Sequence, residues 1–106
     1  MCALKSIRQL CEAGAKAHGS GDALNADFFL RRACSQARGL NSPILEAKIL
    51  NTMAVFALAD GRAGKAVPLL TEARQKVSDR IGAKNKLYTV ISNNLLQAET
   101  AAIGAW

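Results

Sequence analysis

The chain has 106 residues, with 14 Lys and Arg against 8 Asp and Glu, and a formal net charge of +6. This length is enough for one small domain with a single core, which needs no metal or disulfide framework to hold it. Half of the residues are apolar but only 5% are aromatic, a composition that favours closely packed helices over a sandwich of strands. We therefore expect one all-α domain spanning residues 1–106.

Cysteine spacing and the N-terminal residues exclude several classes of protein. Cys2, Cys11 and Cys34 form no CxxC pair, so the sequence predicts neither a disulfide framework nor a metal site. No apolar run reaches membrane-spanning length, and none follows Lys5 and Arg8 in the manner of a signal peptide. These features predict a cytoplasmic protein without an anchor or membrane contact.

Apolar residues recur at helical spacing over five segments separated by short polar connections. The predicted helices cover about residues 3–17, 23–39, 43–59, 63–81 and 85–103, and either Ser20 or Asp22 caps the second. Pro43 begins the third helix because proline lacks the amide hydrogen that a first turn cannot use. Pro68 lies early in the fourth helix, where its cost is reduced, and Gly82 is suited to ending that helix.

Two segments of the chain match at a shift of 40 residues without a gap. The alignment of "LCEAGAKAHGSGDALNADFFLRRA" (10–33) with "LNTMAVFALADGRAGKAVPLLTEA" (50–73) pairs Leu10 with Leu50, Gly14 with Ala54, Gly21 with Gly61, Ala26 with Ala66, Leu30 with Leu70 and Ala33 with Ala73. A further shift of about 42 places "NTMA" (51–54) on "NNLL" (93–96). A period of this length is typical of a helical solenoid.

The matched residues resemble the tetratricopeptide repeat (TPR) family, most closely the longer variant found in kinesin light chains and many bacterial regulators. The resemblance implies a right-handed solenoid of antiparallel helix hairpins in a bacterial cytoplasm, with repeats at about residues 4–39 and 44–82 and a half repeat at 85–104. The sequence departs from the family pattern at Ala17 and Ala57, where a Tyr is common, and in ending after the first helix of a third repeat.

The resemblance also predicts a binding face. In a TPR-like solenoid the first helix of each hairpin lines a concave surface that binds a peptide or helix of a partner. The pattern places the following residues on that surface: Arg8, Lys48, Asn51, Val55, Asn93 and Gln97. In similar proteins, asparagines like Asn51 and Asn93 hold the backbone of an extended peptide, since a side-chain amide both donates and accepts. The alternative is an Asn that bonds only to a neighbouring helix.

Charge adds detail to the predicted partner. Arg8 and Lys48 would attract acidic groups, but the basic clamp with which chaperone-binding relatives hold a terminal carboxylate is not reproduced, because Cys11, Ala15 and Thr52 stand where Lys or Asn would be needed. Binding to a chaperone C-terminus is therefore not expected.

Two other functions are compatible with the sequence. The unfinished third repeat could pair with a second copy of the chain or with a further domain, with Trp106 covering part of that edge, which would make the chain an oligomerisation unit or part of a longer repeat protein. Nucleic-acid binding is disfavoured. Basic residues gather at Arg31, Arg32, Arg38, Lys84 and Lys86, but no aromatic residues were identified between them for base stacking.

No catalytic constellation is recognised, and we expect neither enzyme activity nor a cofactor. His18 lies at a predicted turn without a nearby carboxylate or thiol pattern, and Cys11 and Cys34 fall on helix faces as small core residues do. The sequence contains no triad pattern and no glycine-rich phosphate loop. Two runs of charge at helical spacing predict solvated stripes: Lys5, Arg8, Glu12 and Lys16, and Glu72, Lys76 and Arg80.

Overall fold

The computed structural model describes residues 2–104, which form five α-helices and contain no strand. The helices are α1 (Cys2–Gly19), α2 (Ala23–Gly39), α3 (Pro43–Ala59), α4 (Ala63–Ile81) and α5 (Lys86–Gly104). The predicted all-α class and the number of helices are confirmed over these residues. Helices α3 and α4 have the predicted bounds, and the predicted ends of the others differ from the observed ones by one or two residues.

The first three turns share one geometry and lie 20 residues apart. Backbone N–H groups of Asp22, Ser42 and Arg62 donate to the carbonyls of Ala17, Ala37 and Ala57 at 2.8, 3.1 and 2.8 Å. The residue before each donor has a positive φ: 79° at Gly21, 54° at Asn41 and 75° at Gly61. This six-residue closure with a left-handed residue ends a helix while satisfying its last carbonyls. Each helix and its turn therefore repeat every 20 residues, half the period found in the sequence.

Caps and prolines explain where the helices begin. The carboxylate of Asp22 accepts from the Asn25 N–H at 3.1 Å and so caps α2, whereas the Ser20 hydroxyl donates backward to the carbonyl of Lys16. Pro43 is the first residue of α3. Gly82, with a φ of 80°, ends α4 as expected.

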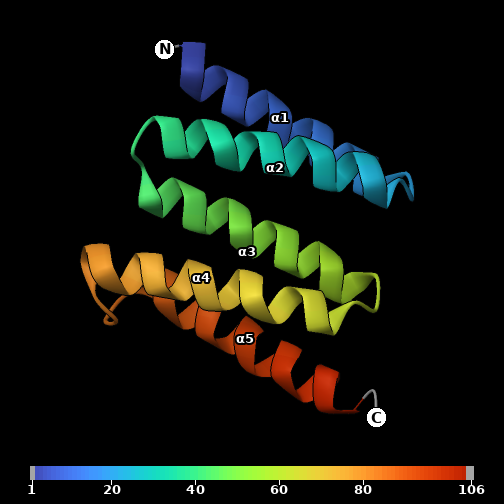
Figure 1. Ribbon diagram of the computed structural model, residues 1–106, viewed down its shortest axis with the longest axis vertical. Coiled ribbons are helices and arrows are strands. Elements are labelled where there is room, and N and C mark those ends of the chain that lie inside the picture. The colour runs from blue at the N-terminus through green and yellow to red at the C-terminus, as the bar shows by residue number, and fades with distance from the viewer. Residues whose placement is uncertain (1, 105–106) are drawn as a thin grey trace.

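Helices pack against their neighbours in chain order, from α1 at one end of the long axis to α5 at the other (Figure 1). The molecule measures 45 × 35 × 18 Å, so its shortest dimension is less than two helix diameters. The core contains a leucine at the same place in each of the first four helices, Leu10, Leu30, Leu50 and Leu70, of which Leu10 is half-buried. Because the core is thin, every helix keeps one side toward solvent.

The outer side of α5 is largely polar. Ile91, Leu95 and Ala98 are buried in the core. At the 42-residue shift, the buried Ala47, Leu50, Ala54 and Ala57 of α3 correspond to Thr89, Ser92, Leu96 and Glu99, none of which is buried. A polar outer face is what a terminal helix needs in order to remain in solution. The predicted covering by Trp106 lies outside the described residues.

Gly14 marks the closest approach within the first hairpin, and its replacement gives a test. A methyl group at this position would lie 2.9 Å from Leu30 Cγ. We expect Gly14→Ala to lower the free energy of unfolding by about 1 kcal/mol, because overpacking outweighs the better helix propensity of Ala. Urea denaturation measures this change.

Gly64 provides the matched control because a methyl group there meets nothing within 4 Å. Gly64→Ala should therefore raise stability by up to about 1 kcal/mol. Equal stabilisation by both substitutions would show that α1 and α2 are not held at this spacing.

Candidate functional site

The six residues predicted to bind a partner lie on three helices. Arg8 is on α1, Lys48, Asn51 and Val55 are on α3, and Asn93 and Gln97 are on α5. All are exposed except Asn51, which is half-buried. Spacings of three and four residues place the members from α3 on one side of that helix and those from α5 on one side of theirs.

Asn51 is engaged between helices. Nδ2 of Asn94 on α5 donates to Oδ1 of Asn51 on α3 at 2.9 Å, and the bond is partly buried. The sequence matched Asn51 with Asn93, but the residue that reaches Asn51 is the next one along. This arrangement agrees with the alternative in which Asn51 satisfies a neighbouring helix, and it leaves Asn93 exposed to solvent.

A cavity of about 420 Å³ opens where the α3–α4 turn meets the end of α5. Its lining is mostly small and apolar: Leu58, Gly61, Arg62, Ala63, Gly64, Ala101 and Ala102. Ala101 follows the exposed Gln97 by one helical turn. The cavity is therefore close to the α5 part of the predicted face.

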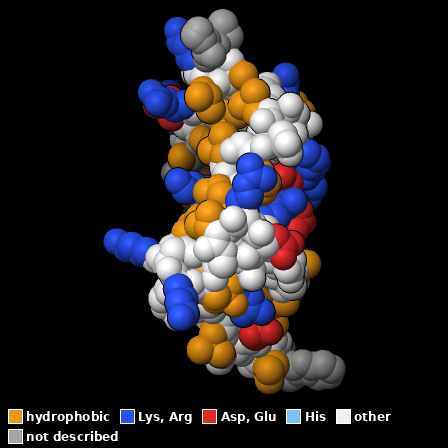
Figure 2. Space-filling view, turned by 90° about the vertical axis from the view of Figure 1, so that its left-hand side faces the viewer, with side chains coloured by type: hydrophobic (Ala, Val, Ile, Leu, Met, Phe, Trp, Pro, Cys, Tyr) orange, Lys and Arg blue, Asp and Glu red, His pale blue; other side chains and the backbone are white. Residues whose placement is uncertain are grey.

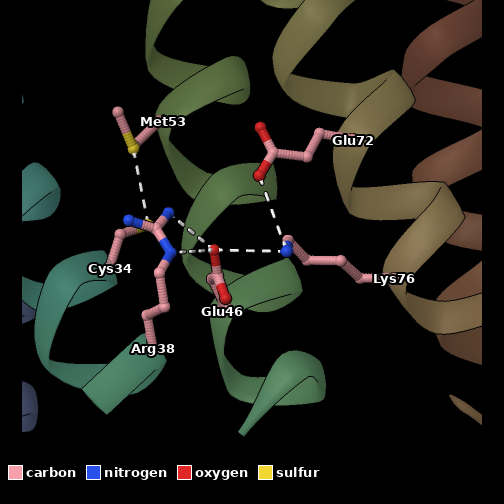
Figure 3. A network of polar contacts seen from close by, with 6 residues as sticks. All are labelled: Cys34, Arg38, Glu46, Met53, Glu72 and Lys76. Atoms are coloured by element: carbon pink, nitrogen blue, oxygen red, sulfur yellow. Dashed lines mark hydrogen bonds and ion pairs between the residues drawn. The ribbon is translucent and has the colours of Figure 1, made fainter. Parts of the chain in front are cut away.

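Glu46 is a charged residue inside the core, with 3% of its surface exposed. Its Oε2 accepts from Arg38 of α2 at 3.2 Å (Nε) and 2.8 Å (Nη2), and lies 3.4 Å from Lys76 Nζ of α4 (Figure 3). Lys76 Nζ also lies 3.7 Å from Glu72 Oε2. One carboxylate of α3 thus bridges the two helices that flank it.

The sequence contained a signal for this bridge that the analysis above did not use. Glu46, Leu50, Met53 and Ala57 follow one another at spacings of four, three and four, which places Glu46 on the buried side of α3. A carboxylate there requires partners. Lys76 was assigned to a solvated stripe, but only 27% of its side chain is exposed because it reaches inward to Glu46.

A second ion bridge joins the N-terminal parts of α2 and α4. Asp27 accepts from Arg31 Nε at 2.6 Å and from Lys65 Nζ at 3.3 Å. Burial raises the pKa of Asp27, but the hydrogen bond and charge of Arg31 and the charge of Lys65 outweigh it, so the pKa is lowered below its ordinary value. The stabilisation from Asp27 is therefore present above the ordinary pKa of an aspartate and is lost as the pH falls through the lowered one.

Between the two bridges lies a cavity of about 200 Å³, which we call the α2–α4 groove. Its lining combines a largely apolar floor with charged walls: Arg31, Cys34 and Arg38 from α2, Leu50 and Met53 from α3, and Leu69 and Glu72 from α4. The Cys34 thiol donates to Met53 Sδ at 4.0 Å. Burial, followed by the charge of Glu46, raises the pKa of Cys34 to about 11. The thiol is therefore protonated at neutral pH and is a poor nucleophile.

His18 has the nearby carboxylate that the sequence analysis did not find. Its ring stacks on Phe56 with centroids 4.1 Å apart, and its Nε2 lies 3.3 Å from Asp60 Oδ1 in an ion-pair geometry without a hydrogen bond. Asp60 belongs to the α3–α4 turn, 42 residues along the chain. The contact joins the end of α1 to that of α3, a packing role that requires knowledge of how the hairpins lie together.

The predicted basic patch is partly neutralised. Arg31 and Arg38 bind carboxylates, and basic and acidic side chains lie next to one another along the right-hand side of the view in Figure 2. Arg32 lies 5.8 Å from the centroid of the Phe28 ring. The expectation that no aromatic residue accompanies these arginines is therefore wrong, although Phe28 is a single ring and offers no series of stacking platforms.

Comparisons with known proteins leave the family open. No protein-family model, curated protein or solved structure matches the chain, so the resemblance to TPR proteins stays a prediction. Within residues 2–104, no group of three or more His, Cys, Asp or Glu residues is arranged to hold a metal ion. None of the helices in that range combines the length and the apolar character needed to cross a membrane.

The Glu46 bridge can be tested by removing its two sides separately. Replacing both Arg38 and Lys76 with Met should lower the free energy of unfolding by about 3 kcal/mol, because it leaves a buried carboxylate without a cation. Adding Glu46→Leu should restore most of that loss, since an apolar side chain needs no partner there. Urea denaturation of both variants measures the difference, and a triple variant no more stable than the double one would contradict the assignment.

The protonated state of Cys34 predicts its reactivity. In the native protein, Cys34 should resist alkylation by iodoacetamide at pH 8 and become reactive as the pH approaches the folded-state value of about 11. Peptide mass spectrometry after timed labelling follows the reaction, with urea-unfolded protein as the control. Modification of Cys34 at pH 8 as fast as in the unfolded chain would show that its thiol is neither buried nor shifted.

Proposed function

We propose that this protein is an interaction scaffold or adaptor that binds a peptide or helix of a partner protein on the side formed by α1, α3 and α5. The supporting observation is the agreement between sequence repeat and burial. Residues 40 apart are buried alike: Gly14 and Ala54, Ala26 and Ala66, Leu30 and Leu70, and Ala33 and Ala73. In our proposal, these hairpins are TPR-like repeats stacked as a right-handed solenoid with a concave binding face.

The exposed residues of this side suit an extended, acidic segment. Arg8 and Lys48 are exposed cations on α1 and α3, and the whole chain has an excess of six positive charges. Asn93 and Gln97 carry side-chain amides that can donate to and accept from a peptide backbone. Asn51 contributes indirectly in this proposal, by fixing α5 through Asn94.

Apolar contacts on the same side would supply anchoring energy. Val55 is 40% exposed between the polar positions of α3. The cavity of about 420 Å³ at the end of α5 offers a mostly apolar lining for an aliphatic side chain of the partner. A peptide held by amide bonds along the helices and by one apolar residue in the cavity would use both kinds of contact.

Two alternatives have weaker support. Self-association through α5 would bury Thr89, Ser92 and Glu99 together with Leu96, and such a mixed surface gives little apolar area. Nucleic-acid binding would draw on arginines that already bind Asp27 and Glu46. Light scattering at high protein concentration tests the first alternative, and a steep salt dependence of binding to DNA or RNA would indicate the second.

The proposal predicts a specific loss of peptide binding. We would select 12-residue peptides from a random display library on the immobilised protein and measure their affinities by fluorescence anisotropy. A variant with Lys48→Ala, Asn93→Ala and Gln97→Ala should bind the selected acidic peptides about tenfold more weakly, because the exposed contacts are removed without touching the core. Circular dichroism checks that the helices remain.

The matched control removes similar side chains elsewhere. Thr71, Gln75 and Lys84 are exposed and lie outside the proposed face, and their joint replacement by Ala should leave the affinity unchanged. Recovery of no binding peptide, or equal losses in the two triple variants, would contradict binding on the α1, α3 and α5 side.

A further inference from the structure

The α2–α4 groove has features of a second binding surface, on another side of the molecule. Met53 and Leu50 of its floor are offset from Lys48 and Val55 by about 140° to 200° around α3, at 100° per residue. A partner bound in the groove would therefore not compete directly with a peptide on the α1, α3 and α5 side. The groove is independent of the proposed function.

Apolar side chains form its floor. Cys34, Leu50 and Met53 are buried, and Leu69 is half-buried on the α4 wall. The volume of about 200 Å³ has room for one aliphatic or methionine side chain. Displacing water from such a floor favours an apolar occupant over a polar one.

The α2 wall presents cations that are already held in place. The side chains of Arg31 and Arg38 are 62% and 63% exposed, although each is bonded to a carboxylate beneath it. Asp27 engages only Nε of Arg31, and Glu46 engages Nε and Nη2 of Arg38. A guanidinium has five N–H donors, so both arginines retain donors for an acidic partner (Figure 3).

We propose that the α2–α4 groove binds a helix of another protein, in which a Leu or Met side chain enters the groove between two acidic residues that bind Arg31 and Arg38. The two arginines are seven residues apart on α2, with Cys34 between them, which corresponds to about 10.5 Å. A partner helix with Glu at positions j and j+7 and Met at j+3 or j+4 presents the same spacing on one side.

Charge on the opposite wall sets the orientation of that helix. Glu72 of α4 lines the groove and is 49% exposed. It would repel an acidic residue and attract a Lys or Arg of the partner. The partner helix is therefore acidic along its edge next to α2 and basic along its edge next to α4, an arrangement that gives specificity through charge.

The Met53 methyl group reports directly on occupancy of the groove. We would titrate protein labelled with ¹³C at the methionine methyls with a 16-residue helical peptide carrying Glu at j and j+7 and Met at j+3. The Met53 resonance should shift and saturate with this peptide, and should not shift with a peptide in which Lys replaces both Glu. A peptide with Ala in place of Met should bind at least about fivefold more weakly, since the apolar anchor is lost.

A matched pair of variants tests the role of the α2 wall. Arg31→Gln should weaken binding of the acidic peptide about threefold, whereas Arg32→Gln, which removes the same charge from an exposed neighbour outside the groove, should leave it unchanged. No shift of Met53 at millimolar peptide would overturn the proposal. Equal binding of the Lys peptide, or equal effects of the two Gln variants, would also overturn it.

Discussion

The structure depends on a fixed distance along the chain between one helix ending and the next. A turn closed by a six-residue hydrogen bond recurs at Gly21, Asn41 and Gly61, and each returns the chain antiparallel to the previous helix. Because helix plus turn is 20 residues each time, Leu30, Leu50 and Leu70 arrive at corresponding places in the core. The small residues around these leucines let the helices approach closely, as Gly14 does against Leu30.

This regular spacing produces surfaces with different chemistry. Helices α2 and α4 flank α3, and the space between them is crossed by ion bridges at Asp27 and at Glu46. On another side of α3, the exposed Lys48 and Val55 lie near α5, which is held there by the Asn51–Asn94 hydrogen bond. Buried charge is costly unless paired, so the bridges fix the relative position of α2 and α4 more narrowly than apolar packing alone would.

Local signals in the sequence were sufficient for the helices but not for their side-chain partners. Pro43, Gly61 and Gly82 act on the backbone within a few residues, which is why the bounds of α3 and α4 could be predicted. The contacts of His18 with Asp60 and of Asn51 with Asn94 join residues about 40 apart, and they depend on the register between hairpins. Helical spacing did place Glu46 in the core, so that residue was predictable, whereas its choice of Arg38 and Lys76 as partners was not.

The most direct test of this account is a set of nuclear Overhauser contacts measured in solution. If the hairpins lie side by side in chain order, the ring of His18 should show contacts to the ring of Phe56, and the side-chain amide of Asn94 should show contacts to Asn51. Absence of both, together with contacts between α1 and α5 that close the helices into a bundle, would contradict the arrangement on which both binding surfaces rest.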